Sequence, residues 1–342
     1  MANIPNKWYD GSAYTENYIM KTMVSKNEIV EILRTPTKRK WYSKIGLILF
    51  VMTIPTVLYF FIFHYLPIGG LVIAFKNYNA FQGIFNSPWT DMGGFKHFVT
   101  FVTSPNFWQL IGNTLYLSVM SILFNSICPI VFALLLNEVK PKRFKKAIQT
   151  IMYAPYFISV SVLVGMLFVF FNSDSGIFTK ILGAFGFDAA NLLENPDYFC
   201  MIYVVSGLWQ GLGWWSIVYM GNLSNVDPNL HDAAIIDGAG RFRRIISVNL
   251  PSIIPLATIM FIMSIGNILS VGFEKVYLMQ LDPNLVSSQI ISTYVYAISF
   301  PEYGIPQFSY ATAIGLFNSL VNIIILCIAN FVSKKVSSNS LW

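Results

Sequence analysis

The sequence predicts an all-α polytopic membrane protein with six transmembrane helices, and three observations support this fold class. Of the 342 residues, 55% are hydrophobic and only 11% are charged, whereas a soluble domain averages about 25% charged residues. Positive charge gathers in alternate connections between apolar stretches. Six stretches reach the ~18 apolar residues that a bilayer-crossing helix needs and contain no Asp, Glu, Lys or Arg: Ile45–Leu66, Leu110–Leu136, Ile148–Phe171, Phe199–Gly221, Ser252–Gly272 and Ala311–Val332.

Lysine and arginine are distributed unequally between the two sides that these spans define. Of the 22 such residues, 18 lie in residues 1–44, 137–149 and 222–251 or after the last span. The remaining connections contain only Lys76, Lys96, Lys180 and Lys275. The positive-inside rule therefore predicts that both termini are cytoplasmic. This topology also explains the net charge of +6, so we expect no nucleic-acid partner.

The spans divide the chain into three parts. Residues 1–44 form a polar N-terminal segment, residues 45–335 a membrane domain and residues 336–342 a short tail. Met20–Leu33 is compatible with a modest amphipathic helix or with an unstructured tail, and both interpretations remain open. Lys38–Tyr42 combines basic and aromatic residues, which is typical of an anchor at the lipid headgroups, so membrane lipid is an expected partner.

Catalytic and metal-binding motifs are absent from the sequence. The three cysteines, Cys128, Cys200 and Cys327, lie within or at the edge of spans and form no CxxC pair, so their spacing does not suit a metal site. There is no GxxxxGK[ST] phosphate loop, no HExxH and no GxSxG. We therefore expect a chain that is not an enzyme and that binds no metal or cofactor itself.

Residues 222–251 form the most informative connection. Asp227-Pro228 is typical of a helix start, because an Asp side chain accepts backbone N–H bonds and Pro suits the first helical position. We expect a short helix from residue 228 to about residue 239, ended by Gly238 and Gly240. The small residues of this helix would let a partner approach its backbone closely. The alternative is a solvated connector whose arginines only enforce topology.

The same connection resembles the EAA loop of the permease subunits of binding-protein-dependent type I ABC importers. The family pattern reads E-A-A, three residues, G, nine residues and I-x-L-P. The family's frequent D-G-A also appears, as Asp237-Gly238-Ala239. The residues that match the pattern without a gap are Asp232, Ala233, Ala234, Gly238, Val248, Leu250 and Pro251. Asp232 stands in place of Glu and Val248 in place of Ile, and the Asp side chain is one methylene shorter.

This resemblance implies a function and a set of partners. It implies a transport subunit of a bacterial cytoplasmic membrane that works with a second permease, usually a different chain. Two ATPase subunits that bind ATP and Mg²⁺, and an extracellular solute-binding protein, complete the machine. Closure of the ATPases moves the docked loop helices, and the permease pair alternates between inward-facing and outward-facing states. The residues implied in ATPase coupling are Asp232, Ala233, Ala234, Asp237, Gly238, Ala239, Leu250 and Pro251.

A finer resemblance concerns the substrate. The chain resembles the branch of these permeases assigned to oligosaccharides derived from complex polysaccharides, the aldouronate type. The segments that carry this resemblance are Tyr65–Tyr78, Ser87–Trp89, Pro105–Trp108 and Gly112–Leu115. An oligosaccharide is accordingly the expected substrate. Its expected path involves Gln210 and Trp214 in the fourth span and Asn267 in the fifth, because aromatic rings stack on sugars and amides bond to hydroxyls. The alternative for the fourth span is helix packing, in which glycine allows close approach.

A second function class stays open at this point. An ion-coupled secondary transporter of a polar solute would also be a multi-pass protein. Proton coupling normally requires intramembrane carboxylates or histidines, and no Asp or Glu lies in any of the six spans. This observation disfavours proton coupling, but it leaves sodium sites built from carbonyl oxygens as the alternative.

Overall fold

The computed structural model describes residues 44–186 and 191–336. The chain divides into two compact units, residues 1–69 and residues 70–342. In the described residues the fold is nearly all helical, and its one β interaction is an isolated bridge between Lys76 and Trp89. The expectations for the N-terminal segment and for the tail fall on residues 1–43 and 337–342, which lie outside the described residues.

Four helices in the described residues are long and apolar enough to cross a membrane. They are Gly46–Phe75, Phe107–Asn137, Arg241–Ile265 and Phe308–Lys335, and a bent pair of helices, Lys142–Phe157 with Val160–Phe170, makes up to five. The stretch expected as the fourth span lies inside α10 (Pro196–Leu223), a 28-residue helix that is not among these four.

The first unit contains one described helix. It begins as α2 (Lys44–Phe60), passes through a π-helical turn (Phe61–Tyr65) and continues as α3 (Leu66–Ile68). The helix continues past the expected end of the span at Leu66 and reaches Phe75 through a 3₁₀ segment. Pro67 lacks an N–H and clashes with the preceding helical turn. The π turn, in which the Leu66 N–H bonds to the Phe61 carbonyl, gives Pro67 the room it needs.

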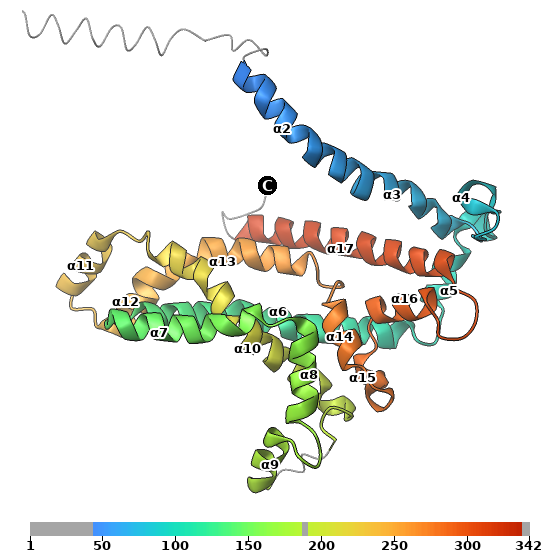
Figure 1. Cartoon of the computed structure of the whole chain (residues 1–342). Coiled ribbons are helices and arrows are strands. Elements are labelled where there is room, and N and C mark those ends of the chain that lie inside the picture. The colour runs from blue at the N-terminus through green and yellow to red at the C-terminus, as the bar shows by residue number, and fades with distance from the viewer. Residues whose placement is uncertain (1–43, 187–190, 337–342) are drawn as a thin grey trace, which may run out of the picture. The chain divides into compact units, whose positions relative to one another are not determined.

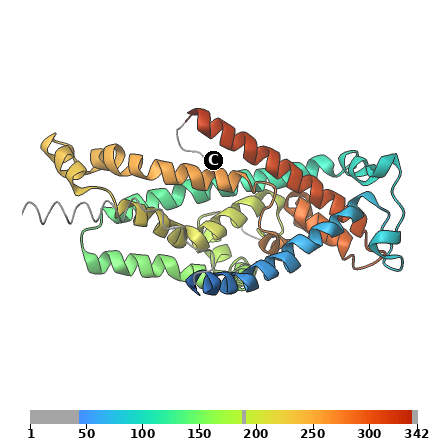
Figure 2. The ribbon, with the colours of Figure 1, turned by 90° about the horizontal axis from the view of Figure 1, so that it is seen from above.

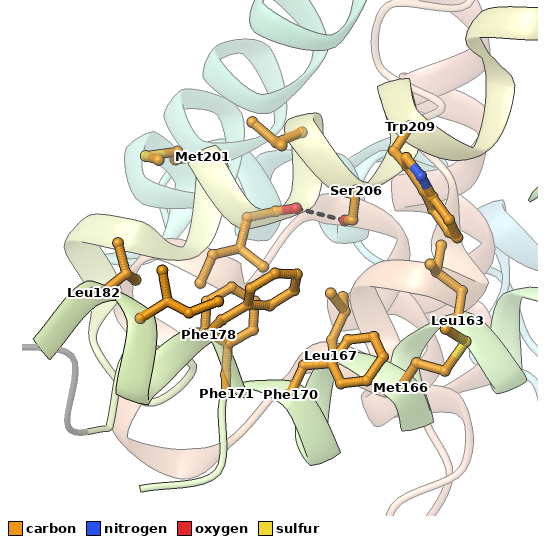
Figure 3. A pocket seen from close by; sticks show the side chains of 13 residues that line it. Leu163, Met166, Leu167, Phe170, Phe171, Phe178, Leu182, Met201, Ser206 and Trp209 are labelled. Carbon is orange, nitrogen blue, oxygen red and sulfur yellow. Dashed lines mark hydrogen bonds between the residues drawn. The ribbon is translucent and has the colours of Figure 1, made fainter. Parts of the chain in front are cut away.

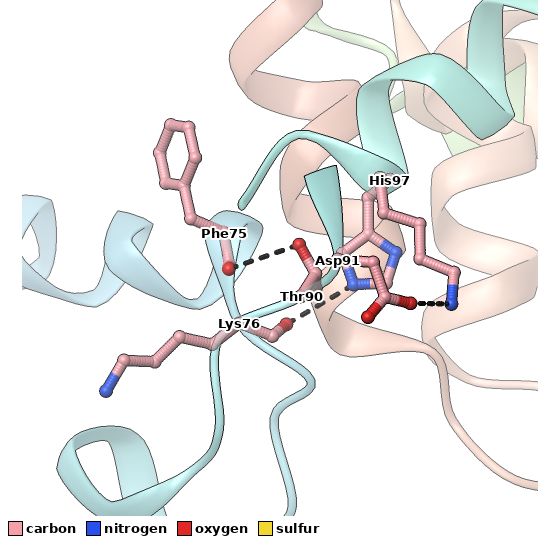
Figure 4. A network of polar contacts seen from close by, with 6 residues as sticks. Phe75, Lys76, Thr90, Asp91 and His97 are labelled. Atoms are coloured by element: carbon pink, nitrogen blue, oxygen red, sulfur yellow. Dashed lines mark hydrogen bonds and ion pairs between the residues drawn. The ribbon is translucent and has the colours of Figure 1, made fainter. Parts of the chain in front are cut away.

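In the second unit a compact segment follows, with α4 (Gly83–Asn86) and α5 (Lys96–Val102). Backbone and side-chain bonds hold it together around Lys76 (Figure 4). The Thr90 hydroxyl donates to the Phe75 carbonyl, and Lys96 pairs with Asp91 at 2.7 Å. Burial lowers the pKa of His97, so the ring is neutral at pH 7 and its Nε2 lies 3.3 Å from the Lys76 carbonyl oxygen.

Four long helices form the body of the second unit: α6 (Phe107–Asn137), α10, α13 (Leu250–Ile265) and α17 (Phe308–Val336). Both views show them running side by side (Figures 1 and 2). α6 and α10 share the most extensive contact, and α13 packs against α6, α10 and α17. Buried apolar side chains join these helices, as where Ile253 of α13 meets Leu134 and Tyr219.

The expected third span is not one helix. α7 (Lys142–Tyr153) and a 3₁₀ turn (Ala154–Phe157) are followed by α8 (Val160–Phe170) at an angle of 99°. Pro155 cannot continue the hydrogen bonds of α7, and Ile158 and Ser159 adopt extended backbone angles. The Ser159 hydroxyl then accepts the Val162 N–H and starts the new helix.

The expected fifth span, Ser252–Gly272, is shifted along the chain. Its helix begins with α12 (Arg241–Arg244) and a π turn (Ile245–Asn249), which accommodates Pro251 as the earlier π turn accommodates Pro67. The helix ends at Ile265 because Gly266 and Asn267 are weak helix formers and the next N–H groups bond elsewhere. The Leu269 N–H, for example, bonds to the Asn322 side chain of α17 at 3.1 Å.

Short helices cover one end of the bundle: α9 (Ile177–Ala184), α14 (Phe273–Met279), α15 (Leu285–Ser288) and α16 (Ile291–Ser299). Asn284, which is fully buried, holds several of them together. Its amide donates to the Leu193 and Met279 carbonyls, and its Oδ1 accepts the Ser288 hydroxyl. These bonds join the end of α14 to α15 and to the segment that precedes α10.

Candidate functional site

The helix expected in the connection between α10 and α13 is present. It is α11 (Pro228–Ile236), and it begins where the sequence predicts. The Asp227 carboxylate accepts the Asn229 N–H at 2.9 Å, which satisfies one of the free donors at a helix start. The start of this helix is therefore fixed locally, without help from the membrane bundle.

The end of α11 corrects the expected boundary. The helix stops at Ile236, one turn before Ala239, and Gly238 adopts the left-handed conformation with φ +76°. The Ala239 N–H bonds to the Ala234 carbonyl at 2.8 Å, and the Gly238 N–H to the Ile235 carbonyl at 3.0 Å. This pair of bonds is the Schellman termination, and it needs a residue that tolerates positive φ.

The surface of α11 is exposed and partly apolar. Asp232, Ala233, Asp237 and Gly238 are exposed, and the alanines at 234 and 239 are half-buried. Sequence reasoning missed the large apolar side chains beside them. The sequence does indicate such a surface, because large apolar residues in a connection between spans are unusual on a free surface. These exposed side chains are Leu230 (55%), Ile235 (52%), Ile236 (86%) and Phe242 (75%).

The base of this loop is tied to the long helices. Leu250, half-buried, packs against the buried cluster that α6, α10 and α13 form, and Pro251 follows it with its side chain exposed. Asn249 is fully buried, and its amide nitrogen lies 3.4 Å from a carboxylate oxygen of Glu138 at the end of α6. Because the base is buried and the tip is exposed, a force on α11 would reach all three helices.

A second candidate region is a cavity of about 600 Å³ between α6, α10 and α13. Polar groups alternate with apolar ones along its wall. The Ser121 hydroxyl is buried and has no hydrogen-bond partner among the described residues, which leaves it available to a bound polar group. The lining residues are Ser121, Ile122, Asn125, Ser126, Gly207, Trp215, Tyr219, Met260, Met263, Ser264 and Asn267.

Of the three residues expected on a substrate path, only Asn267 lines this cavity. The Gln210 amide instead donates to the Ile158 carbonyl at 2.7 Å, at the break between α7 and α8. Trp214 stacks on Tyr156 with ring centroids 4.4 Å apart and planes within 4° of parallel. Both residues therefore contact the bent pair of helices.

The polar residues that line the cavity follow a helical spacing in the sequence. Ser121, Asn125 and the neighbouring Ser126 lie on one face of α6, and Ser264 and Asn267 continue one face of α13. In both helices the spacing is three or four residues, which places side chains on the same side of a helix. Polar residues repeated at this spacing in an apolar helix typically face the interior of a bundle.

A buried lysine packs against α10. Nζ of Lys275, on α14, donates to the Tyr203 carbonyl at 2.8 Å and lies 4.6 Å from the centre of the Tyr203 ring. The side chain is 7% exposed. Because burial disfavours the charged form, it lowers the pKa of Lys275 to about 7.

A separate pocket of about 490 Å³ lies between α8, α9 and α10 (Figure 3). Its wall is apolar apart from Ser206 and Trp209. The Ser206 hydroxyl donates to the Ile202 carbonyl of its own helix, as Figure 3 shows. This pocket offers few polar groups to a sugar, so the polar cavity is the better candidate for a substrate path.

Comparison with known proteins decides the family. Residues 129–338 match the family described as "Binding-protein-dependent transport system inner membrane component". The chain is also 40% identical to Protein LplB of Bacillus subtilis (strain 168), in an alignment that covers 86% of this chain and 91% of that one. The chain belongs to this family. It is a permease, a membrane-embedded multi-pass transport subunit rather than an enzyme, as the EAA-like spacing predicts.

Other relatives of this permease agree. It is 38% identical to the "Polygalacturonan/rhamnogalacturonan transport system permease protein YteP" of the same organism, over 86% of this chain and 90% of that one. It is 36% identical to a chain of a bacterial ABC transporter "involved in the import of the acidic polysaccharide alginate", with a TM-score of 0.78. That match covers 86% of this chain and 97% of the other. The fold is therefore that of a type I ABC importer permease, and the family does not support the ion-coupled alternative.

Proposed function

We propose that this permease forms half of the membrane pathway of an ATP-driven importer for an oligosaccharide derived from a complex polysaccharide. The observation that carries the proposal is the polar cavity between α6, α10 and α13. Its hydroxyl and amide groups suit sugar hydroxyls, and the rings of Trp215 and Tyr219 suit the apolar faces of sugar rings. The polysaccharide-related relatives support this substrate class.

We further propose that α11 docks into a groove on a separate ATPase. The exposed apolar side chains of Leu230, Ile235 and Ile236 would be covered by the groove, and Asp232 and Asp237 would lie at its polar rim. Ala233, Ala234, Gly238 and Ala239 allow close approach, and Leu250 and Pro251 join the docked helix to the bundle. ATP and Mg²⁺ would bind to the ATPase.

The complete importer would contain this chain, a second and different permease chain, two ATPase subunits and an extracellular binding protein. One solved relative, 35% identical with a TM-score of 0.79, is the alginate transporter "in complex with alginate pentasaccharide-bound periplasmic protein", which supports delivery by such a protein. With α11 at the ATPase, both termini of this permease would lie in the cytoplasm.

The test is uptake of radiolabelled oligosaccharide by proteoliposomes that contain the full complex. We expect uptake only with ATP inside and the loaded binding protein outside. Asn125→Leu should reduce uptake strongly, because it removes an amide from the cavity and adds an apolar group. Asn225→Leu, a change at an exposed position outside the cavity, is the matched control. Uptake driven by an ion gradient without ATP would contradict the proposal.

A further inference from the structure

One face of α7 joins positive charge to apolar surface along the helix. It forms an open groove of about 470 Å³ that is lined by Arg143, Lys146, Ala147, Thr150 and Ile151. This spacing places all five side chains on one side of an α-helix. The two cations come first and the less polar residues follow one to two turns later. All five residues are exposed, so the described residues leave this face open.

The opposite face of α7 packs against α10. The Gln149 amide donates to the Met220 sulfur at 3.4 Å, and Met152 lies against Gly213. Figure 2 shows α7, in green, at an edge of the second unit. The groove therefore points away from α10 and toward whatever surrounds this edge of the protein.

The cations of α7 have no counter-charge of their own. The helix contains Lys142, Arg143, Lys145 and Lys146, and no acidic residue lies in its first turn. The ion pair found among the described residues lies elsewhere, at Asp91. Cations in the first turn of a helix are also repelled by the positive end of the helix dipole. An anion from outside the chain would therefore stabilise this end of α7.

The spacing of charge and apolar surface along α7 suits a phospholipid. α7 begins the bent pair of helices that is long and apolar enough to enter a membrane. Eight residues separate Arg143 from Ile151, which is about 12 Å along a helix axis. The polar headgroup layer is roughly 5–8 Å thick on each side of a bilayer. A cation at the lipid phosphate thus places Ile151, which is 68% exposed, among the acyl chains.

We propose that this groove binds an anionic phospholipid. Its phosphate would lie at Arg143 and Lys146, and an acyl chain would follow the helix toward Ile151. The guanidinium and ammonium groups would form charge-assisted hydrogen bonds to the phosphate oxygens. A zwitterionic lipid brings a cation of its own to the same place, so the groove would bind it less tightly. The bound lipid would supply the counter-charge that α7 lacks.

Photocrosslinking identifies what lies in the groove. Ile151→p-benzoylphenylalanine places a ketone there that, when excited, inserts into a nearby C–H bond. The labelled complex is reconstituted in nanodiscs of equal parts phosphatidylglycerol and phosphatidylcholine with the same acyl chains, and mass spectrometry measures the adducts. We expect phosphatidylglycerol adducts to exceed phosphatidylcholine adducts by more than about fivefold. Fivefold corresponds to about 1 kcal/mol, the contribution of one cation near a membrane surface.

Charge variants in the same labelled background test the recognition. Arg143→Gln combined with Lys146→Gln should bring the ratio of the two adducts down to about one, because Gln keeps the helix propensity but not the charge. Arg143→Lys keeps the charge and should keep the preference. The matched control is Lys334→Gln combined with Lys335→Gln, which removes two charges from the last turn of α17 and should leave the ratio unchanged.

Three results would overturn the proposal. The first is equal crosslinking of both lipids in the labelled complex with its cations intact. The second is a preference that the double variant at positions 143 and 146 does not change. The third is a crosslink to the second permease or to the ATPase in place of lipid, which would show that a protein surface covers the groove. None of these readouts depends on the transported substrate, so they test the lipid site separately from the proposed function.

Discussion

At the scale of single residues, Gly238 is a position where the backbone conformation favours glycine over any other residue. Its φ of +76° lies in the region that side chains disfavour, by roughly 1–2 kcal/mol for a residue with a Cβ. Gly238→Ala should shift the end of α11, and Gly238→Leu should in addition obstruct the proposed ATPase groove. We expect Gly238→Leu to abolish ATPase stimulation by the loaded binding protein in nanodiscs while membrane insertion persists.

Gly240 provides the control for this experiment. Its φ of −65° and ψ of 172° suit any residue, and no atom would meet a Cβ there within 4 Å. Gly240→Ala should therefore behave like the wild type. If Gly238→Leu retained full stimulation and normal recovery of the ATPase, the loop would be a solvated connector and the docking proposal would fail.

We expect different effects from substitutions of Asn267 and Trp214, because Asn267 lines the cavity and Trp214 does not. Asn267→Ala should raise the KM for uptake without changing the yield of assembled complex. Trp214→Ala removes the stack on Tyr156, worth about 0.5–1.5 kcal/mol beyond the buried area, and should lower thermal stability instead. Thermal unfolding and uptake kinetics on both variants separate the two roles, and a stable Trp214→Ala with a raised KM would reverse them.

At the scale of elements, α11 is a short helix with an exposed apolar face. Ile236 is 86% exposed, and if the ATPase covers it, Ile236→Asp should reduce co-purification of the ATPase at least about tenfold, since burying an unpaired charge is strongly unfavourable. Asn225→Asp introduces the same charge at an exposed position before α11 and should have little effect. Equal recovery of the ATPase by both variants would exclude Ile236 from the interface.

The pairing of α7 with α10 depends on close approach at a glycine. A Cβ on Gly213 would lie 2.1 Å from the Met152 carbonyl oxygen, which is backbone and cannot rotate away. Gly213→Ala should force the two helices apart and lower the melting temperature of the purified complex, whereas Gly221→Ala, which meets nothing within 4 Å, should not. Unchanged melting of Gly213→Ala would show that this contact is not needed.

At the scale of the whole molecule, the membrane topology decides which surface can meet the ATPase and which can meet the binding protein. Phe81 is fully exposed on the side predicted to be external, and Ser224 is exposed at the end of α10 on the side predicted to be cytoplasmic. In intact cells an impermeant thiol reagent should label Phe81→Cys and not Ser224→Cys in a background without the native cysteines. The opposite labelling pattern would reverse the orientation of the permease.

The fold class, the family and the start of α11 could be predicted from the sequence alone. These properties depend on composition, on motif spacing and on local capping by Asp227, all of which can be evaluated along the chain. The sequence also located the helix end near Gly238, although not to the residue, because the final turn depends on which carbonyls the last N–H groups reach.

The contacts of the polar residues in the spans depend instead on how the helices pack. Gln210 and Asn267 are both amides in apolar segments, yet one binds the Ile158 carbonyl at a helix break and the other lines a cavity. The Ile158 carbonyl lies at the 99° bend between α7 and α8. This bend arises from Pro155 and from packing against α10 together. Lys275 packs closely against α10 at Gly207, 68 positions earlier in the sequence, where the helix has no side chain. Such contacts between distant residues have no local pattern, so they become visible only when the helices are packed.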